Sequence, residues 1–389
     1  MAGHRRLLTL VITVVLGASA CVLPVPGPGE PVPTIQASID VDIAAATVSV
    51  AVTVQDLAPD FVQVWPDGFA GPAGPRDTQA PWVVTFDAGD LAPGPHRLTV
   101  LAAGGGAVVA LPFDYQLVGC NGAVSLCTRP FDEVRTVTTH NAMSSAADGW
   151  IGPNHNLGVP AQLASGVRAL MLDTHRAGDI NLLGTTQVPG VDPDAAYLCH
   201  TICALGQQPL DEGLGEIKVF LDQHPGAVVT LIIESYLNHD LTAAAFVSSG
   251  LDAYTFTPVP GHPWPTLGEL VESGERLIVT QDRPVDPTHP WLLDVWAEAF
   301  ETHFDNGAPE DFSCAPNRGS PANDLFILNH FLTDVFGNPD LADQVNHDPL
   351  LTSRIVECEA AHATVANFIA VDYSDIGNVH AAVDALNGL

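Results

Sequence analysis

Hydrophobic and polar positions follow two different patterns along the chain, and the change falls near residue 119. Between residues 35 and 118, short runs of alternating apolar and polar side chains are separated by proline and glycine, as in residues 82–86, 96–101 and 108–117. Alternation with a period of two predicts strands with one buried face, and short strands at this spacing predict a small all-β sandwich. Residues 35–118 are therefore expected to form a separate β-domain.

Residues 120–389 show a different pattern, in which continuous apolar runs alternate with helical segments. Stretches 214–223 and 292–301 have the spacing of helices. This alternation predicts parallel strands joined by crossover helices, and the chain lacks the glycine-rich motifs of nucleotide-binding folds. We therefore expect an α/β fold, an irregular TIM-like (β/α) barrel. Its strands are expected at residues 134–139, 167–172, 228–233, 276–280, 325–328 and 368–371.

Polar residues that can do chemistry follow nearly every predicted strand of the second region. Barrel enzymes collect their active-site residues at the carboxyl ends of the strands, so this placement predicts a site there. Polar residues also end strands simply because the chain enters a loop, and that alternative stays open. The residues concerned are His140, Asn141, Asp173, Glu234, Asp282, Asn329, His330 and Asp372.

Residues 1–21 read as an export signal. Arg5 and Arg6 precede the apolar stretch 7–16, which is too short to span a bilayer as a mature helix. Ala18-Ser19-Ala20-Cys21 is similar to a bacterial lipobox, in which the cysteine carries lipid, and it also fits an ordinary signal-peptidase site. A Pro/Gly-rich tether follows at residues 22–34. The protein is expected to be exported, and either lipid-anchored to a bacterial cell envelope through Cys21 or secreted.

The cysteines predict disulfides, which fit an exported protein. The chain has 7 Cys, and setting Cys21 aside leaves an even number. The first two couples are close in sequence, whereas the third is paired only by elimination. A zinc site is the rival interpretation, although no CxxC pair occurs. The expected couples are Cys120 with Cys127, Cys199 with Cys203, and Cys314 with Cys358.

The charge of the chain is strongly negative. It carries 45 acidic and 13 basic residues, for a formal net charge of −32, and Lys218 is the only lysine in the sequence. A surface this acidic repels nucleic acid, so DNA and RNA are excluded as expected partners. It also argues against a highly phosphorylated head group as the substrate.

Three segments resemble, in the same order, the signature segments of phosphatidylinositol-specific phospholipase C catalytic domains of the X type, including the bacterial enzymes. They are residues 139–143 (THNAM), 166–173 (GVRALMLD) and 198–200 (LCH), and residues 228–234 and 368–373 match later strands. The resemblance covers 120–389 and leaves out the β-domain. That domain is similar to immunoglobulin-like modules of bacterial surface proteins.

The resemblance implies cleavage of a phosphodiester by two histidines. His140 would be the base that activates the inositol 2-hydroxyl, with its ring oriented by Asp372, and His200 would be the acid that protonates the departing glycerol oxygen. Imidazoles titrate near neutrality and suit this exchange of protons. The alternatives are a buried structural role for His140 and rigid packing beside a disulfide for His200.

The same resemblance leaves a metal ion open. The family neutralises the phosphoryl charge either with a cation or with an arginine, and Asp173 stands at the position of that arginine. Oxygen ligands fit Ca²⁺ better than zinc. Met171 replaces a carboxylate of the calcium pattern, and Asp173 could instead pair with Arg168 or Arg176. The residues that match calcium-binding positions are Asn141, Asp173 and Glu234.

The expected substrate is phosphatidylinositol, a glycosylated inositol lipid or another phosphodiester. Arg168, Asn329, His330 and Tyr373 are the predicted substrate-binding residues, although each also fits a role in the core or at the rim. Two other functions stay open. One is a glycerophosphodiester phosphodiesterase on a related barrel, and the other is a surface-binding lipoprotein without catalytic activity.

Overall fold

The computed structural model describes residues 10–12, 21–23, 31–176, 195–200 and 203–389. The chain divides into two compact units, Met1–Thr128 and Arg129–Leu389. Each unit has a hydrophobic core of its own. Most of the predicted export signal and the side chain of Cys21 lie outside the described part. In that part no helix is long and apolar enough to cross a membrane.

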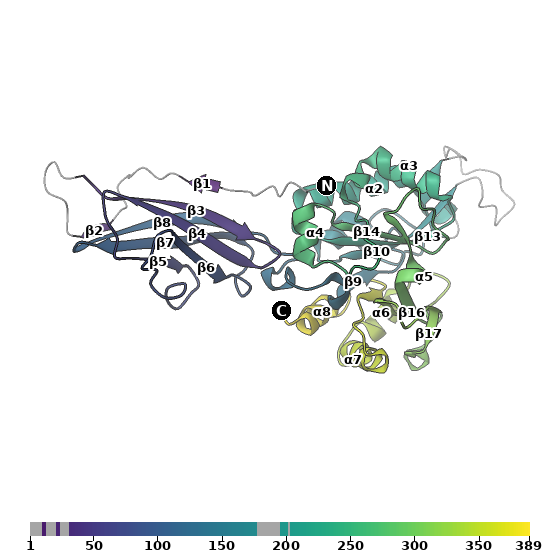
Figure 1. Cartoon of the computed structure of the whole chain (residues 1–389). Coiled ribbons are helices and arrows are strands. Elements are labelled where there is room, and N and C mark those ends of the chain that lie inside the picture. The colour runs from purple at the N-terminus through teal and green to yellow at the C-terminus, as the bar shows by residue number, and fades with distance from the viewer. Residues whose placement is uncertain (1–9, 13–20, 24–30, 177–194, 201–202) are drawn as a thin grey trace. The chain divides into compact units, whose positions relative to one another are not determined.

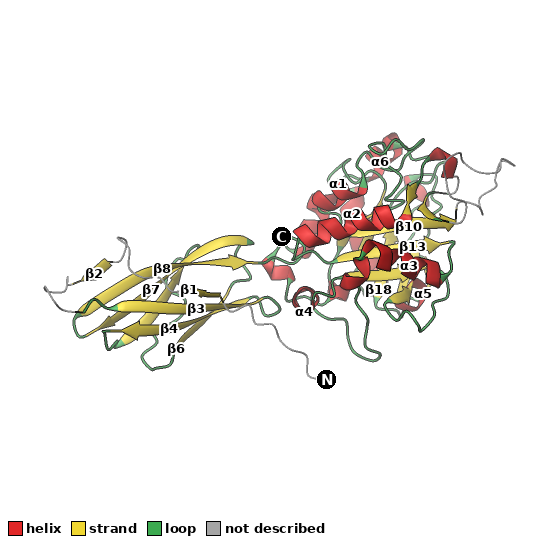
Figure 2. Cartoon of the chain, turned by 90° about the horizontal axis from the view of Figure 1, so that it is seen from above, coloured by secondary structure: helices red, strands yellow, loops and turns green. Residues whose placement is uncertain are grey.

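The first unit consists of two antiparallel sheets of four strands each, which enclose one core (Figures 1 and 2). Buried and exposed side chains alternate along the strands, as the sequence pattern predicts, and Val50 and Val100 place both sheets in the same core. The first sheet has the order β1 (Leu10–Ile12), β3 (Thr34–Asp42), β4 (Thr47–Gln55), β6 (Trp82–Asp87). The second has the order β2 (Cys21–Leu23), β8 (Ala107–Leu117), β7 (Gly94–Gly104), β5 (Phe61–Pro66).

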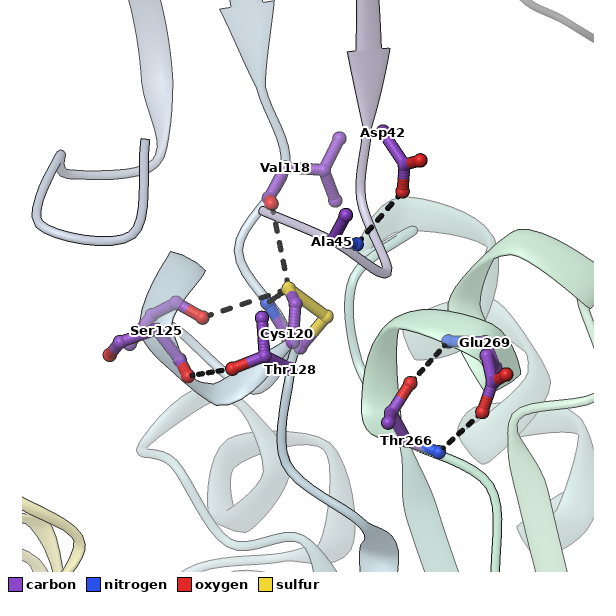
Figure 3. The surroundings of a disulfide bond; sticks show 10 residues. Asp42, Ala45, Val118, Cys120, Ser125, Thr128, Thr266 and Glu269 are labelled. Atoms are coloured by element: carbon purple, nitrogen blue, oxygen red, sulfur yellow. Dashed lines mark hydrogen bonds between the residues drawn. A yellow bond between two sulfur atoms is a disulfide. The ribbon is translucent and has the colours of Figure 1, made fainter. Parts of the chain in front are cut away.

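A short loop closed by a disulfide follows β8. Cys120 and Cys127 are buried, and Figure 3 shows their disulfide beside Ser125 and Thr128. The hydroxyl group of Thr128 donates a hydrogen bond to the carbonyl oxygen of Ser125 at 3.3 Å. The two other predicted disulfides, Cys199–Cys203 and Cys314–Cys358, are also formed. The predicted pairing is therefore confirmed, including the couple that rested on elimination.

The second unit is a mixed α/β fold built on a curled sheet of parallel strands. The strands lie in the order β15-β14-β13-β10-β9-β19-β18-β16, so the first and last strands of the unit, β9 and β19, pair side by side. Within the described residues the path of strand pairing is open between β15 and β16, so hydrogen bonds do not close a ring. The strands are β9 (Thr136–Thr139), β10 (Ala169–Arg176), β13 (Val229–Ser235), β14 (Leu277–Gln281), β15 (Leu292–Asp294), β16 (Ala299–Thr302), β18 (Leu325–Asn329) and β19 (Phe368–Val371).

Three short strands extend this sheet in the antiparallel direction. β17 (Pro316–Gly319) pairs with β16, whereas β11 (Ala196–Leu198) pairs with β10 and with β12 (Gln208–Pro209). They add edges next to the parallel strands without joining the parallel order. The parallel sheet predicted from the sequence is confirmed, and its curled, open form is the finding that the pattern could not give.

Helices cover the outside of the parallel strands, which is why β14, β18 and β19 are buried along their whole length. Figures 1 and 2 both show α2 and α3 beside β13. α4 begins with a capping box between Thr266 and Glu269, drawn in Figure 3. The helices are α1 (Val159–Ala164), α2 (Leu210–Gln223), α3 (His239–Ser249), α4 (Leu267–Ser273), α5 (Val295–Glu298), α6 (Pro339–Val345), α7 (Leu350–His362) and α8 (Val379–Asn387).

The helix predicted for residues 292–301 is wrong. This stretch forms β15, the one-turn helix α5 and β16. The carboxylate of Asp294 accepts a hydrogen bond from the backbone N–H of Trp296 at 2.9 Å and starts α5 there. On either side, β15 pairs with β14 and β16 pairs with β18. Pairing with distant strands therefore overrides the local helical preference.

Candidate active site

A cavity of about 390 Å³ lies at the carboxyl ends of the parallel strands. Almost all of the strand-end polar residues predicted from the sequence line it, and His330 is the exception within the described residues. The edge of the sheet on which they meet is the one where parallel α/β folds place their sites. The lining includes His140, Asn141, Asp173, His200, Glu234, Asp282, Asn329 and Asp372.

His140 is held on two sides at the end of β9. Its Nδ1 lies 3.0 Å from Oδ1 of Asp372, and its ring stacks on Phe331 with 3.8 Å between the ring centroids. The Asp372 side chain is 10 % exposed, and its other oxygen accepts a hydrogen bond from the amide of Asn154 at 3.2 Å. With Nδ1–H donating to the carboxylate, Nε2 is the ring atom left for proton exchange.

A second, buried histidine supports the backbone at His140. Nε2 of His155 lies 2.7 Å from the carbonyl oxygen of His140, and burial lowers the pKa of His155. The neutral ring therefore donates to that carbonyl group. The next residue, Asn141, has φ of 50°, so the chain turns sharply where β9 meets the cavity. Sequence reasoning did not identify Asn154 or His155, because neither lies at a strand end.

His200 lines the same cavity from the segment that follows β11. The disulfide Cys199–Cys203 fixes the chain on both sides of it. Desolvation, and then the nearby His140, lower the pKa of His200, while Glu234 and Asp372 act in the opposite direction. The structure thus brings the two predicted catalytic histidines together in one cavity, close enough for His140 to lower the pKa of His200.

The other side of the cavity is acidic. Asp173 and Glu234 stand opposite each other on β10 and β13, and Asp282 follows β14. Burial, and then the charges of Glu234 and Asp282, raise the pKa of Asp173 well above its ordinary value. The hydroxyl group of Tyr236 donates to Glu234, and its ring stacks on His175, which is a third histidine in the lining.

The predicted calcium ligands Asn141, Asp173 and Glu234 all line this cavity, together with Met171. One amide and two carboxylates supply oxygen atoms of the kind that calcium prefers. No group of three or more His, Cys, Asp or Glu side chains in the described part is arranged to hold a metal ion. Calcium takes about six to eight oxygen ligands, so these residues would provide only part of its shell.

One ion pair in the cavity, between Glu301 and Arg318, was not predicted from the sequence. Glu301 of β16 is fully buried and Arg318 belongs to β17, and both line the cavity. Nε of Arg318 donates to Glu301 Oε1 at 2.5 Å. Glu301 lies in the stretch 292–301, for which the sequence predicted a helix. Arg318 lies in β17, which pairs with β16 after that stretch. A correct assignment of β16 would have placed Glu301 at a strand end.

Two of the four predicted substrate-binding residues are held elsewhere by backbone contacts. Arg168 precedes β10, and its guanidinium donates to the carbonyl oxygens of Leu163 and Val167. Asp173 lies within β10, five residues further along the chain and about 16 Å away at the rise of a strand. Arg168 and Asp173 therefore do not pair, as the sequence had allowed. The hydroxyl group of Tyr373 donates to the carbonyl oxygen of Pro153.

The other two are consecutive residues, Asn329 at the end of β18 and His330 directly after it, and their side chains have different surroundings. His330 is fully buried, with Nε2 at 2.8 Å from the carbonyl oxygen of Val345 and Nδ1 at 3.1 Å from Arg354. Asn329 lines the cavity, yet its amide group donates to Glu301 and to the backbone of Thr302. Among the four, the structure thus brings only Asn329 to the histidines, and there it supports Glu301.

Comparison with known proteins gives a family match over nearly all of the second unit. The family described as PI-PLC X 1 matches residues 126–387. The chain belongs to the PI-PLC X family. A PI-PLC X domain-containing protein 1 from the fungus Arthroderma benhamiae is 32% identical over 305 residues, which cover 72% of this chain and 93% of the relative.

Two further relatives and one solved structure are also similar to this chain. A PI-PLC X domain-containing protein from Arabidopsis thaliana is 28% identical, covering 67% of this chain and 63% of the relative. An uncharacterized secreted protein from Arthroderma benhamiae is also 28% identical, covering 68% and 62%. A phosphatidylinositol-specific phospholipase C from Staphylococcus aureus aligns with a TM-score of 0.46 and 11% identity, covering 66% of this chain and 93% of that chain. These sequence relatives are fungal and plant proteins, so a bacterial source stays a prediction.

Proposed function

We propose that the protein is a phosphodiesterase that cleaves an inositol lipid or a related phosphodiester by general acid–base catalysis. The observation that carries this proposal is the placement of His140 and His200 in one cavity, with His140 bonded to Asp372. Membership of the PI-PLC X family supports the same reaction class.

The proposed first step forms a cyclic phosphodiester. Nε2 of His140 takes the proton of the substrate hydroxyl group while the hydroxyl oxygen bonds to phosphorus. The bond from phosphorus to the leaving alcohol breaks, and His200 gives its proton to that alcohol oxygen. Asp372 keeps the proton of His140 on Nδ1 and stabilises the charged ring that results. In the second step the roles reverse, and water opens the cyclic product.

The test is product analysis by phosphorus NMR, with phosphatidylinositol and glycerophosphodiesters as substrates. We expect a cyclic inositol phosphate from the wild-type protein and none from His140→Ala. The matched control is Asp375→Asn, an exposed carboxylate that bonds to Asn156 and does not line the cavity. Glycerol phosphate as the first product would indicate a glycerophosphodiester phosphodiesterase, and no turnover of either substrate would leave a binding role.

Calcium is a separate proposal, in which Asn141, Asp173 and Glu234 would hold the ion. When bound, the ion would neutralise negative charge on the phosphoryl group. A chelator should then abolish turnover and added Ca²⁺ should restore it. Turnover that a chelator leaves unchanged would contradict calcium use and leave the histidine mechanism standing.

We also propose that the protein is exported and carried at a membrane surface. Three disulfides and the secreted relative support export. Lipid on Cys21 and an immunoglobulin-like fold of the first unit extend this proposal. Nucleic acid is not an expected partner at a net charge of −32. Mass spectrometry of the mature N-terminus tests the anchor, because a terminus without lipid on Cys21 would contradict it.

A further inference from the structure

Glu301 is an anchored carboxylate at the end of β16. It is fully buried and accepts hydrogen bonds from three side chains. Arg318 Nε and Asn317 Nδ2 donate to Oε1 at 2.5 Å and 3.0 Å, and Asn329 Nδ2 donates to Oε2 at 2.9 Å. A buried carboxylate with this many donors has little freedom to move, so it fixes the position of whatever it binds.

Arg318 is the charged partner that Glu301 fixes. Its guanidinium carbon lies 4.4 Å from the ring centroid of Trp296 and 4.9 Å from that of Phe304. The side chain is 40 % exposed although Nε is bound. No residue in the described part accepts a hydrogen bond from its two terminal nitrogen atoms. The guanidinium group is therefore held in one orientation with its terminal N–H groups still available.

The charge of the cavity gives those N–H groups a role. Six carboxylates line it, those of Asp173, Glu234, Asp282, Glu301, Asp334 and Asp372, whereas Arg318 is the single arginine in the described lining, which contains no lysine. Burial raises the pKa of Asp282, which also lines the cavity, and the positive charge of Arg318 acts in the opposite direction. A phosphodiester is an anion, and a cavity this acidic would repel it unless a fixed positive charge receives it.

We propose that Arg318 binds the phosphoryl oxygens of the anionic substrate through its two terminal nitrogens, held in place by Glu301, Trp296 and Phe304. The planar fork of a guanidinium group suits two phosphoryl oxygens at once. This inference rests on the proposed function and adds the residue that receives the anion. It places the arginine on β17, an edge strand of the same sheet that β9, β19, β18 and β16 separate from β10. On β10, the resemblance puts Asp173 at the arginine position of the metal-independent enzymes.

The test measures binding rather than turnover, in His140→Ala protein, so that a failure of the proposed reaction does not decide it. The probes are glycerophosphoinositol and inorganic phosphate, titrated by calorimetry in the presence of a chelator. Arg318→Met should weaken binding of glycerophosphoinositol by about tenfold to one-hundredfold, the range expected when a charged hydrogen-bond donor is lost. Arg97→Met is the matched control, because Arg97 is an exposed arginine of the first unit, paired with Asp114.

Arg318→Lys is the second variant, since it keeps the positive charge and loses the planar fork. It should bind glycerophosphoinositol at a level between wild type and Arg318→Met. Nitrogen-15 NMR of arginine-labelled protein gives a readout that needs no substitution, and the Arg318 side-chain signals should shift on titration with either probe. Binding of both probes by Arg318→Met within twofold of Arg97→Met, or unchanged Arg318 signals at saturation, would overturn the inference.

Discussion

Replacing Asp372 with asparagine tests the proposed base most directly. The substitution keeps the size of the side chain and removes its charge. His140 and Asn154 both donate to the two oxygens of Asp372, at 3.0 Å and 3.2 Å. An asparagine offers these two donors one oxygen and one NH₂ group. Either His140 or Asn154 must therefore face the NH₂ group, which is itself a donor. If His140 is that donor, its proton moves to Nε2 and the ring can no longer act as a base.

The structure also bounds the size of the effect. The Oδ1 atom of Asn154 is buried without a hydrogen-bond partner, so its amide group can rotate and accept from the new asparagine. His140 would then keep its tautomer and lose only the stabilising charge. We expect turnover to fall by about 10²-fold in that case and by about 10⁴-fold without the rotation, a loss of about 3–5 kcal/mol of transition-state stabilisation.

The assay is the initial rate of phosphatidylinositol cleavage in mixed micelles at neutral pH, with kcat and KM determined separately. KM should change little, because Asp372 acts through His140 and not on the bound lipid. Asp375→Asn, which changes an exposed carboxylate three residues away, should keep full turnover. A thermal melt within a few degrees of wild type shows that the fold is intact. A kcat for Asp372→Asn within threefold of wild type would refute the role given to the pair.

Three further predictions concern the acid, its loop and the core. His200→Ala should lower turnover of phosphatidylinositol by about 10²-fold or more and that of a nitrophenyl ester by under about tenfold, since nitrophenolate leaves without a proton; equal losses would contradict an acid role. Removal of Cys199–Cys203 by double alanine substitution should lower kcat with little change in the melting temperature, whereas removal of Cys120–Cys127 should leave kcat within about twofold of wild type. Equal losses of kcat in the two variants would contradict a role of the first disulfide in positioning His200. Burial, and then Arg354, lower the pKa of His330 from 6.5 to about 3, so the unfolded chain binds this proton more tightly and stability falls as pH drops from about 6.5 toward 3. The loss should reach about 3 kcal/mol at pH 4 in urea titrations and be smaller in His330→Gln; a protonated His330 by NMR at pH 5 would contradict this.

Much of the fold could be predicted from local patterns. Strands such as β13 and β19 are continuous apolar runs, and their burial in a parallel sheet follows from that property alone. The stretch 292–301 could not be predicted in the same way, because its strands exist through pairing with β14 and β18, and its local sequence resembles a helix. The open path between β15 and β16 has the same cause, since it depends on which strands fail to meet.

The candidate site divides along the same line. His140 and Asp372 could be found because each follows an apolar run, and the sheet order then makes them neighbours. Asn154 and His155 lie in a loop whose position depends on tertiary contacts, so their support of the base was invisible in the sequence. Arg168 and His330 illustrate the opposite error. Their residue types suit a binding site, but burial and backbone contacts use their polar atoms.

The pairing of β9 with β19 has a consequence for the timing of activity. His140 and Asp372 are 232 residues apart in the chain, yet they form one hydrogen bond because the first and last parallel strands are adjacent. A growing polypeptide carries the imidazole long before the carboxylate that orients it has been synthesised. If His140 is the proposed base, only a finished and folded molecule has it in its oriented form. A nascent chain, or one cut before Asp372, would then lack activity.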